Sequence, residues 1–333
     1  MHRDEILLKI KNLSVGYKTH KGLAKVLDQI NLSVGTGEKV GIIGESGSGK
    51  TTLLSSILKV LPPNAVITSG EIIMEGINLL SCKAKILENI RREKVGMIFQ
   101  DPMSSLNPFY KVRDHLYYAL KYSGYRNIPK HELEKICIEL LKEVKLPDPY
   151  RVLDSYPFQL SGGMRQRVVI ALALIRANIL LLADEPTTNL DVTLQEQILE
   201  LIKDLVKKRK MAVILVTHAV GSLLDFADRI YVMYSGQVVE TAPAEELVYS
   251  PAHPYTSLLL ESYPKFKGEW KPKELIGGVI DYTDPPPGCR FSLKCPFKMD
   301  ICLKAKPPSI EVNDRHIVWC WRYKNKHGEG LSR

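Results

Sequence analysis

The sequence predicts an α/β core that carries a helical insertion and ends in a tail of different composition. Four short apolar runs flanked by turn residues are typical of buried parallel strands, at 40–43, 95–99, 179–183 and 213–216. The stretch 111–145 has helical character with no strand pattern inside it. Residues 264–333 hold 14 Lys and Arg against 8 Asp and Glu, and 8 of the 20 prolines. This change in composition indicates a separate C-terminal region.

The remaining elements fit the same plan. Residues 6–10 and 13–17 alternate apolar and polar side chains, which predicts two half-exposed strands. After the strand at 40–43, apolar side chains recur at helical spacing, at Leu53, Leu54, Ile57, Leu58 and Leu61. Strands that alternate with helices favour a parallel sheet.

The composition is that of a globular protein, with 45% hydrophobic and 25% charged residues. The most apolar segment, 168–183, is interrupted by Arg176 and Asn178, so it falls short of the ~18–20 apolar residues of a spanning helix. Residues 1–12 lack the long apolar run of a secretory signal, and we therefore expect an intracellular chain. Of the net charge of +9, the stretch 264–333 contributes +6 (14 − 8), which favours solvated surface lysines over a nucleic-acid or lipid surface.

The segment GIIGESGSGKTTLL contains the P-loop pattern Gly44-x4-Gly49-Lys50-Thr51 between a predicted strand and a predicted helix. Glycines let the backbone N–H groups wrap around phosphates, and the helix N-terminus adds its dipole. We expect Lys50 to reach the β- and γ-phosphates and the Thr51 hydroxyl to ligate Mg²⁺. The predicted nucleotide-binding residues here are Gly44, Ser46, Gly47, Ser48, Gly49, Lys50, Thr51 and Thr52.

The segment ILLLADEP places two adjacent carboxylates at the end of a buried apolar strand. Asp184 is predicted to hold Mg²⁺ directly or through water. Glu185 is predicted to polarise the attacking water as a general base. Because a P-loop requires an acidic strand end of this kind, the two motifs support each other.

The segment LSGGMRQR places Ser161, Gly162 and Gly163 before a helix, which makes a second exposed anion-binding helix N-terminus. A second phosphate cradle is redundant within one site. It is useful if it caps a nucleotide that is held by another subunit.

With these motifs in this order, the chain resembles the ATP-binding subunits of ABC transporters, in which two such subunits sandwich two ATP molecules. The resemblance runs from about Leu7 to the C-terminus. It implies a P-loop NTPase (RecA-like) core with an antiparallel β subdomain and a helical insertion. It also implies that Tyr17 stacks on adenine, that Gln100 ligates Mg²⁺ and senses the γ-phosphate, and that His218 holds the γ-phosphate.

Two positions depart from the family pattern. The stretch Asn189-Leu190-Asp191 matches the dimer-contact loop, with Asn189 where Ala is common. Ala219 follows the histidine where Asp is usual. Neither change removes a phosphate contact, so the resemblance still implies a subunit that hydrolyses ATP.

Three further segments, DPMSSLNP, YPFQLSGGMRQR and SPAHPYTSLLL, are similar to the ATPase subunits of dipeptide and oligopeptide importers. This resemblance implies an ABC ATP-binding domain at 1–240, with the helical insertion at about 101–166, and a C-terminal extension at 241–333. It implies a second homologous ATP-binding subunit, two membrane permease subunits, contacted at about 101–115, and an extracellular solute-binding protein. The expected location is the cytoplasmic face of the membrane, with no nucleic-acid partner.

The tail holds Cys289, Cys295, Cys302 and Cys320, separated by five, six and seventeen residues. An intracellular setting argues against disulfides, so the four thiolates suggest either zinc or an iron–sulfur centre. Structural zinc sites usually use closer pairs, and the wider spacing favours an iron–sulfur centre. The family resemblance points to one [4Fe–4S] cluster with one thiolate from each cysteine. Cys82 and Cys137 are expected to be structural.

Three alternatives remain open at this point. The same machinery could import oligosaccharides, since the cargo is not encoded in this chain. A soluble ABC ATPase acting on nucleic acid or ribosomes would explain the basic tail, although such proteins generally have two cassettes or a long coiled coil. A purely structural partner that does not hydrolyse ATP is opposed by Glu185 and by 161–163.

Overall fold

The structure is a computed structural model that describes residues 5–188, 190–261 and 280–324. The chain forms two compact units that are not contiguous in sequence. The helical unit is built on Ser81–Val216 together with Gly35–Lys39. The P-loop unit consists of Ile6–Val34, Val40–Leu80 and the described residues from Thr217 onward.

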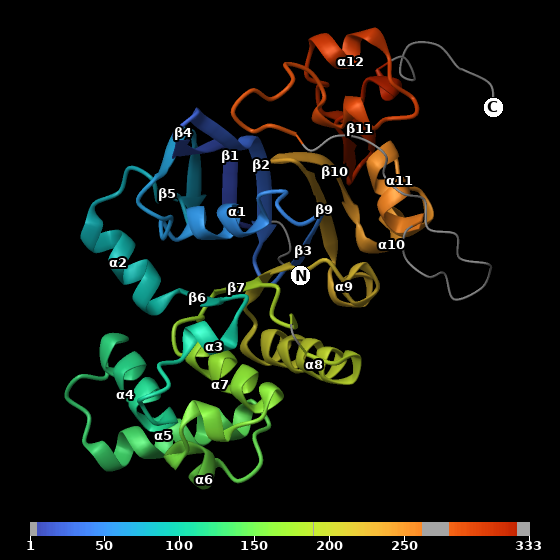
Figure 1. The fold of residues 1–333 in the computed structure, drawn as a ribbon. Helices are drawn as coiled ribbons and strands as arrows, with labels where there is room; N and C mark the ends of the chain where they lie inside the picture. Colours follow the sequence, from blue (N-terminus) through green and yellow to red (C-terminus); the bar gives the residue numbers. More distant parts are fainter. Residues whose placement is uncertain (1–4, 189, 262–279, 325–333) are drawn as a thin grey trace. The chain divides into compact units, whose positions relative to one another are not determined.

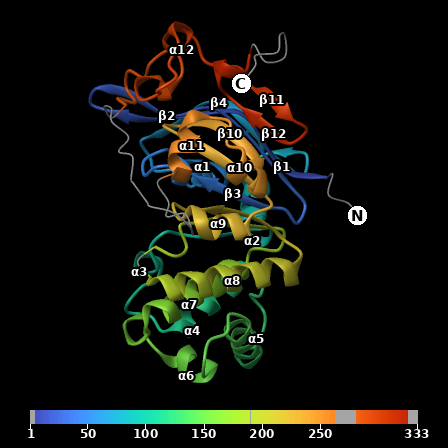
Figure 2. The same cartoon turned by 90° about the vertical axis from the view of Figure 1, so that its right-hand side faces the viewer.

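The helical unit combines strands with a group of helices (Figure 1). Its elements are α2 (Ala84–Glu93), β6 (Val95–Ile98), α3 (Pro102–Ser105), α4 (Val112–Tyr122), α5 (Lys130–Glu143), α6 (Pro149–Asp154), the 3-10 helix η1 (Pro157–Gln159), α7 (Gly162–Leu174), β7 (Leu180–Asp184), α8 (Val192–Arg209) and β8 (Ala212–Val216). The strands run parallel in the order β8-β7-β6, and β7 and β8 are buried along their whole length. Helix α8 lies beside α7 in both ribbon views (Figures 1 and 2).

The P-loop unit contains two sheet regions. Its elements before the helical unit are β1 (Ile6–Thr19), β2 (Gly22–Gly35), β3 (Lys39–Ile43), α1 (Lys50–Ile57), β4 (Ala65–Met74) and β5 (Ile77–Asn78). Its later elements are α9 (Val220–Phe226), β9 (Arg229–Tyr234), β10 (Gln237–Pro243), α10 (Ala244–Tyr249), α11 (Pro254–Glu261), η2 (Arg290–Leu293), α12 (Asp300–Lys304), β11 (Ile310–Asn313), β12 (His316–Val318) and η3 (Trp321–Tyr323).

Strand pairing links the C-terminal segment directly to the strand that leads into the P-loop. One sheet has the order β2-β1-β4-β5, with β1 antiparallel to β4 and Leu8 opposite Met74. In the other region, β3 pairs in parallel with β9, and β9, β10, β12 and β11 follow as antiparallel neighbours. The residues after 240 therefore extend the same sheet that positions the P-loop.

Several expected elements differ in extent. The two strands expected at 6–10 and 13–17 are one continuous strand, β1, whose register against β4 shifts between Lys11 and Ser14. This irregularity absorbs the polar residues that break the alternation in the sequence. The helix after the P-loop ends at Ile57, earlier than its apolar spacing indicates. The domain boundary expected at 240 stays a prediction.

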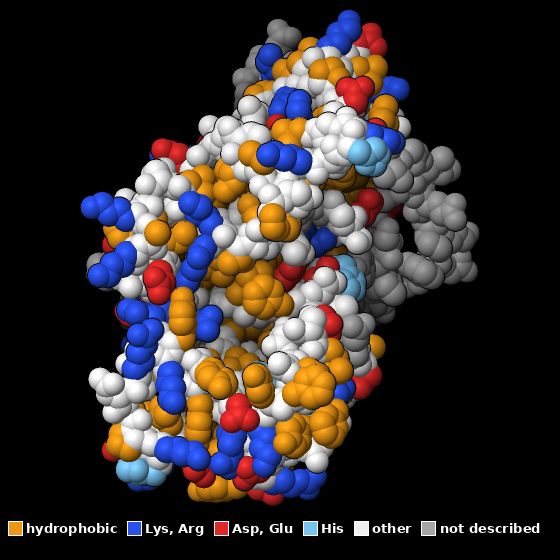
Figure 3. Space-filling model, turned by 60° about the vertical axis from the view of Figure 1, so that its left-hand side comes forward, with side chains coloured by type: hydrophobic (Ala, Val, Ile, Leu, Met, Phe, Trp, Pro, Cys, Tyr) orange, Lys and Arg blue, Asp and Glu red, His pale blue; other side chains and the backbone are white. Residues whose placement is uncertain are grey.

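The helical unit exposes large hydrophobic side chains. Phe109, Phe158 and Met103 are 85%, 64% and 53% exposed. Figure 3 shows hydrophobic side chains on the lower, helical part of this face, interspersed with Lys and Arg. Exposed apolar side chains gathered in one region are typical of an interaction surface. Among the described residues, no helix combines the length and the apolar character that crossing a membrane requires.

Candidate active site

The phosphate-binding loop connects β3 to α1 and has a backbone shape that depends on glycine. Gly49, which precedes α1, has a φ of 97°, in the region that favours glycine. A Cβ atom on Gly44 would lie 2.1 Å from the carbonyl oxygen of Met233, and this is too close for any side chain. The loop can therefore bring backbone N–H groups close to phosphate oxygens.

The Lys50 side chain lies inside this loop. It is 5% exposed, and its Nζ donates hydrogen bonds to the carbonyl oxygens of Gly44 and Glu45, each at 2.9 Å. Carbonyl oxygens orient the ammonium group at the first turn of α1, where the helix dipole also favours anions. Of the other predicted residues of the loop, Ser48 is buried, while Ser46 and Thr51 are exposed.

Tyr17 on β1 is fixed to the start of α1. Its hydroxyl lies 3.0 Å from the Thr52 hydroxyl, and the side chain is half-buried. Both residues were expected to bind the nucleotide. The structure places the Tyr17 hydroxyl of β1 against Thr52 of α1, and the stacking of Tyr17 on adenine stays a prediction.

The two carboxylates in the helical unit follow each other at the end of β7. Asp184 is its last residue and is 2% exposed. Glu185 has a φ of 45°, a left-handed conformation that is unfavourable for a residue with a side chain, and its N–H donates to the carbonyl oxygen of Val216 at 2.9 Å. This hydrogen bond to β8 holds the strained residue in place, so that its side chain leaves the strand in a fixed direction.

Two donors orient the Glu185 carboxylate. Gln100 Nε2 donates to Glu185 Oε2 at 3.2 Å, and the Thr188 hydroxyl donates to the same oxygen at 3.1 Å. The structure thus places Gln100 beside the predicted base, while its expected roles as Mg²⁺ ligand and γ-phosphate sensor stay predictions. Thr188 was not predicted. Its only signal is its position three residues after Glu185, within the turn that follows β7. An oriented carboxylate of this kind is suited to accept a proton from water.

The segment 161–163 begins α7 as expected. Ser161 is the N-cap, and its hydroxyl accepts a hydrogen bond from the N–H of Met164 at 3.3 Å. A Cβ atom on Gly163 would lie 3.2 Å from a methyl group of Leu194, so the helix start packs closely against α8. The helix has 13 residues, which gives a full dipole at this end.

The remaining residues of the predicted site follow β8 and β7. His218 is exposed and lies two residues before α9, in the P-loop unit. Asn189 lies outside the described residues. Asp191 is the N-cap of α8, and its carboxylate accepts from the N–H of Leu194 at 3.0 Å. At the second departure from the family pattern, the N–H of Ala219 donates to the Thr217 hydroxyl at 3.0 Å.

Three side chains have the chemistry that Mg²⁺ prefers. Thr51 offers a hydroxyl, Gln100 an amide and Asp184 a carboxylate, and hard cations such as Mg²⁺ take oxygen ligands. The Asp184 carboxylate is almost fully buried, and a buried carboxylate is stable only when hydrogen bonds or a cation compensate for lost water. By their chemistry, Gln100 and Asp184 in the helical unit and Thr51 in the P-loop unit fit this ion, and their ligation of it stays a prediction.

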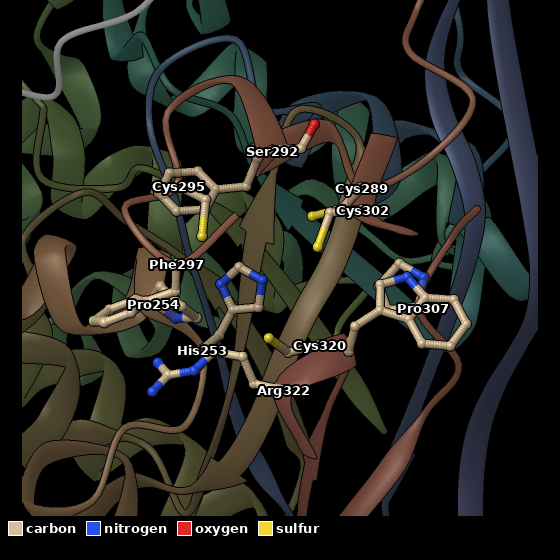
Figure 4. A pocket seen from close by; sticks show the side chains of 12 residues that line it. His253, Pro254, Cys289, Ser292, Cys295, Phe297, Cys302, Pro307, Cys320 and Arg322 are labelled. Atoms are coloured by element: carbon tan, nitrogen blue, oxygen red, sulfur yellow. The ribbon is translucent and has the colours of Figure 1, made fainter. Parts of the chain in front are cut away.

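The four tail cysteines gather around a small cavity with the buried ring of His253 (Figure 4). All four are free thiols, and Cys289, Cys302 and Cys320 are buried. Burial raises the pKa of the Cys289 thiol to about 12 and also raises the pKa values of Cys295 and Cys320. These three thiols therefore stay protonated at neutral pH.

The prediction that Cys289, Cys295, Cys302 and Cys320 ligate one [4Fe–4S] cluster is wrong. Within the described parts of the chain, no group of three or more His, Cys, Asp or Glu side chains is placed to hold a metal ion. The cavity has a volume of about 10 Å³, which is room for about one water molecule. The cysteines line this cavity together with Phe291, Phe297 and Trp321, as small apolar side chains do.

Two family models match the chain. The model described as "ABC transporter" matches residues 27–188, and the model described as "Oligopeptide/dipeptide transporter, C-terminal region" matches residues 239–302. The first match contains the P-loop, Gln100, the segment 161–163 and Glu185. The second contains α10, α11 and three of the four tail cysteines.

Curated relatives resemble the chain over almost its whole length. The oligopeptide transport ATP-binding protein OppD of Bacillus subtilis is 43% identical over 95% of this chain and 88% of its own length. The dipeptide transport ATP-binding protein DppD of the same organism is 41% identical over 95% of each. DppD of Haemophilus influenzae is also 41% identical, over 98% of each.

A solved structure supports the fold. The ATP-binding cassette MJ0796, in a dimeric post-hydrolysis state bound to ADP and Pi, has a TM-score of 0.64 and 32% identity, covering 71% of this chain and 98% of that one. The expected P-loop NTPase fold is thereby confirmed. With the motifs, the two family models and relatives of this identity and coverage, the chain belongs to the family of ATP-hydrolysing, ATP-binding subunits of ABC transporters.

Proposed function

We propose that the chain hydrolyses ATP with Glu185 as general base and thereby powers the uptake of dipeptides and oligopeptides through a membrane permease. The observation that carries this proposal is the Glu185 carboxylate, held by Gln100 and Thr188 at the end of β7. The cargo class is supported by the relatives, which are named for dipeptide and oligopeptide transport, and by the matching C-terminal model.

In the chemical step, the Glu185 carboxylate accepts a proton from a water molecule while the water oxygen attacks the γ-phosphorus of ATP. A new phosphorus–oxygen bond forms, the bond from the γ-phosphorus to the bridging oxygen breaks, and ADP leaves with that oxygen. Lys50 and the loop N–H groups bind the phosphates, and His218 binds the γ-phosphate. Mg²⁺, held by Thr51, Gln100 and Asp184, would neutralise phosphate charge.

The assembly follows from the second anion-binding helix. The start of α7, capped by Ser161, would bind the nucleotide of a second homologous ATP-binding subunit, and that subunit would serve this chain in return. Two permease subunits and an extracellular solute-binding protein complete the importer. The chain would then sit at the cytoplasmic face of the membrane, attached to the permease rather than inserted in the lipid.

The permease contact is supported by exposed side chains in the predicted range 101–115. Met103, Phe109 and Tyr110 are 53%, 85% and 47% exposed, and they lie on and just after α3 in the helical unit. Large apolar side chains of this kind are stabilised when a partner covers them. A short helix of a permease subunit that lays its apolar face on these residues would bury them.

Reconstitution of the whole importer tests this proposal. The chain, its partner ATPase and the permease subunits are placed in liposomes, and uptake of a labelled dipeptide is measured with ATP and the solute-binding protein. We expect uptake with wild-type chain and none with Glu185→Gln. Uptake of labelled oligosaccharide and not of peptide would contradict the proposed cargo. Recovery of the native chain with ribosomes, without membrane proteins, would contradict the proposed assembly.

A matched pair of variants tests the permease contact. Phe109→Asp should abolish co-purification with the permease, because a charge replaces an apolar anchor, while ATP binding stays unchanged. Phe158→Asp, 64% exposed but outside 101–115, is the control. Equal loss of the permease in both variants would argue against a contact confined to the predicted range.

A further inference from the structure

Two tyrosines from the C-terminal segment hold the backbone of the phosphate-binding loop. The hydroxyl of Tyr255, in α11, accepts a hydrogen bond from the N–H of Glu45 at 3.0 Å. The hydroxyl of Tyr282 donates one to the carbonyl oxygen of Gly47 at 2.7 Å. All four residues belong to the P-loop unit. The two tyrosines lie more than 200 positions from the loop in the sequence, as the separations of 210 and 235 residues show.

These contacts fix the orientation of two peptide groups in the loop. In the peptide that joins Gly44 to Glu45, the carbonyl oxygen accepts from Lys50 Nζ and the N–H donates to Tyr255. In the peptide that joins Gly47 to Ser48, the carbonyl oxygen accepts from Tyr282 and the N–H donates to the carbonyl oxygen of Glu45. A planar peptide held at both ends cannot rotate without breaking a hydrogen bond.

Tyr255 is locked by buried aromatic packing. The side chain is fully buried, and its ring centroid lies 4.7 Å from that of Tyr234 and 5.5 Å from that of Phe291. Phe291 is 1% exposed and also lies 5.1 Å from Tyr234 in an edge-to-face arrangement. Such aromatic pairs contribute beyond their buried area. The position of the Tyr255 hydroxyl is therefore set by a residue of η2 in the tail.

Tyr282 is held by its backbone and by Arg290. The Tyr282 carbonyl oxygen accepts from the N–H of Lys25 on β2 at 2.7 Å, and the Arg290 guanidinium lies 5.7 Å from the centre of its ring. Arg290 is 1% exposed and forms an ion pair with Asp28 at 3.4 Å. Burial raises the pKa of the Tyr282 hydroxyl, which keeps it protonated as a hydrogen-bond donor.

A third contact reaches the loop through the turn between β9 and β10. Gly236 N–H donates to the carbonyl oxygen of Ser48 at 2.9 Å. Arg290 donates to the carbonyl oxygen of the preceding residue, Ser235, and to that of Lys25 at 3.2 Å. The turn is therefore held between the loop and a buried arginine of the tail.

We infer that Tyr255 and Tyr282 are positioning residues for the phosphate-binding loop, through which the C-terminal extension sets the affinity of the site for ATP. The inference rests on the proposed role of the loop and Lys50 in binding the nucleotide. A loop already held in its binding shape loses less conformational freedom when ATP binds, and it therefore binds more tightly. The contribution is to nucleotide binding and not to the chemical step at Glu185.

The test compares Tyr282→Phe and Tyr255→Phe in the full-length chain, each of which removes one hydroxyl and keeps the ring. Binding of a fluorescent ATP analogue and the kcat and KM of hydrolysis are measured. Each variant should raise Kd and KM by about threefold to tenfold, the effect of one hydrogen bond, with kcat within about twofold of wild type. Tyr249→Phe, 79% exposed on α10, is the control and should leave all three constants unchanged.

Two outcomes would overturn the inference. Unchanged Kd in both variants would show that the hydroxyls do not position the loop. A fall in kcat with KM unchanged would show that they act on the chemical step instead. Lys50→Ala is measured in parallel: if it lost ATP binding while both tyrosine variants bound normally, only the inference would fail. Normal binding by Lys50→Ala would instead overturn the proposed nucleotide site, and the inference with it.

Discussion

The P-loop unit stabilises buried charge in two different ways, one at the phosphate-binding loop and one where the C-terminal tail packs. At the loop, the Lys50 ammonium donates hydrogen bonds to the backbone carbonyl oxygens of Gly44 and Glu45, which hold it in position. In the tail, charged side chains hold each other. Arg290 pairs with Asp28, and the His316 ring pairs with Glu240 at 2.6 Å and with Glu246 at 3.0 Å.

This difference separates a ligand-binding region from a structural one. Carbonyl oxygens carry only partial charges, so they can orient a cation while it retains a strong attraction for a phosphate. The full charges of Asp28 and Glu240 compensate their cationic partners within the fold, and removing either partner leaves a buried charge. Changes to Lys50 should therefore alter ATP binding, whereas changes to the charged pairs of Arg290 and His316 should first alter stability.

The largest expected effect is that of Lys50→Ala on nucleotide binding. The variant should raise the Kd for ATP about 100-fold, because charge-assisted contacts with two phosphates are lost. Its free energy of unfolding should change by no more than about 1 kcal/mol, because the hydrogen bonds from Lys50 Nζ to the carbonyl oxygens of Gly44 and Glu45 add little net stability. Calorimetric titration and chemical unfolding measure the two quantities, with Lys21→Ala, exposed between β1 and β2, as the control. A larger loss of stability than of affinity would show that Lys50 is mainly a structural residue.

Arg290→Met should have the next largest effect, and on stability. The change leaves Asp28 with the ion pair to Lys306 at 2.7 Å but removes its buried partner. We expect the free energy of unfolding to fall by about 2 kcal/mol. Chemical unfolding measures this, and Arg315→Met, in the exposed turn between β11 and β12, should have no such effect. Equal stability of the two variants would show that the Arg290 pair is not structural.

The smallest effect is a pH dependence at His316. Burial lowers the pKa of this imidazole, but hydrogen bonds and charge from Glu240 and Glu246 outweigh burial and raise it above its usual value. The stabilisation is therefore complete below the unfolded-state pKa of about 6.5 and is lost as pH rises through the folded-state pKa.

His316→Asn should accordingly be less stable than wild type by about 1–2 kcal/mol near pH 6, and the difference should shrink toward pH ~9. Thermal unfolding across this range measures it, and His131→Asn, 69% exposed on α5, provides the control. A difference that grows with pH would contradict the assignment of a protonated His316.

The sequence predicts those features that a local pattern dictates. The strands at 40–43, 95–99, 179–183 and 213–216 lie close to β3, β6, β7 and β8, because buried parallel strands are continuous apolar runs. The P-loop pattern prescribes a backbone shape through its glycines, and the structure has that shape. The cysteine spacing prescribes only side-chain identities, and the same four residues fold into a cluster of free thiols around a small cavity.

Other features depend on tertiary contacts that no local pattern encodes. Tyr255 and Tyr282 reach the loop because β9 and β10 bring the C-terminal segment beside β3. Thr188 acts on Glu185 because the chain turns after β7, and a threonine three residues after a glutamate is otherwise unremarkable in a sequence. The continuous strand β1 depends on its pairing with β4, which tolerates a shift in register.

The proposed general base is tested most directly by comparing Glu185→Gln with Glu196→Gln. Glu196 is an exposed residue on α8. The amide keeps the size of the Glu185 side chain and one oxygen that can accept the hydrogen bonds from Gln100 and Thr188, but it cannot accept a proton from water. In the full-length chain with its partner ATPase, Glu185→Gln should bind ATP like wild type and hydrolyse it at least about 100-fold more slowly, while Glu196→Gln stays unchanged. Wild-type turnover by Glu185→Gln would contradict the central claim that this carboxylate is the general base.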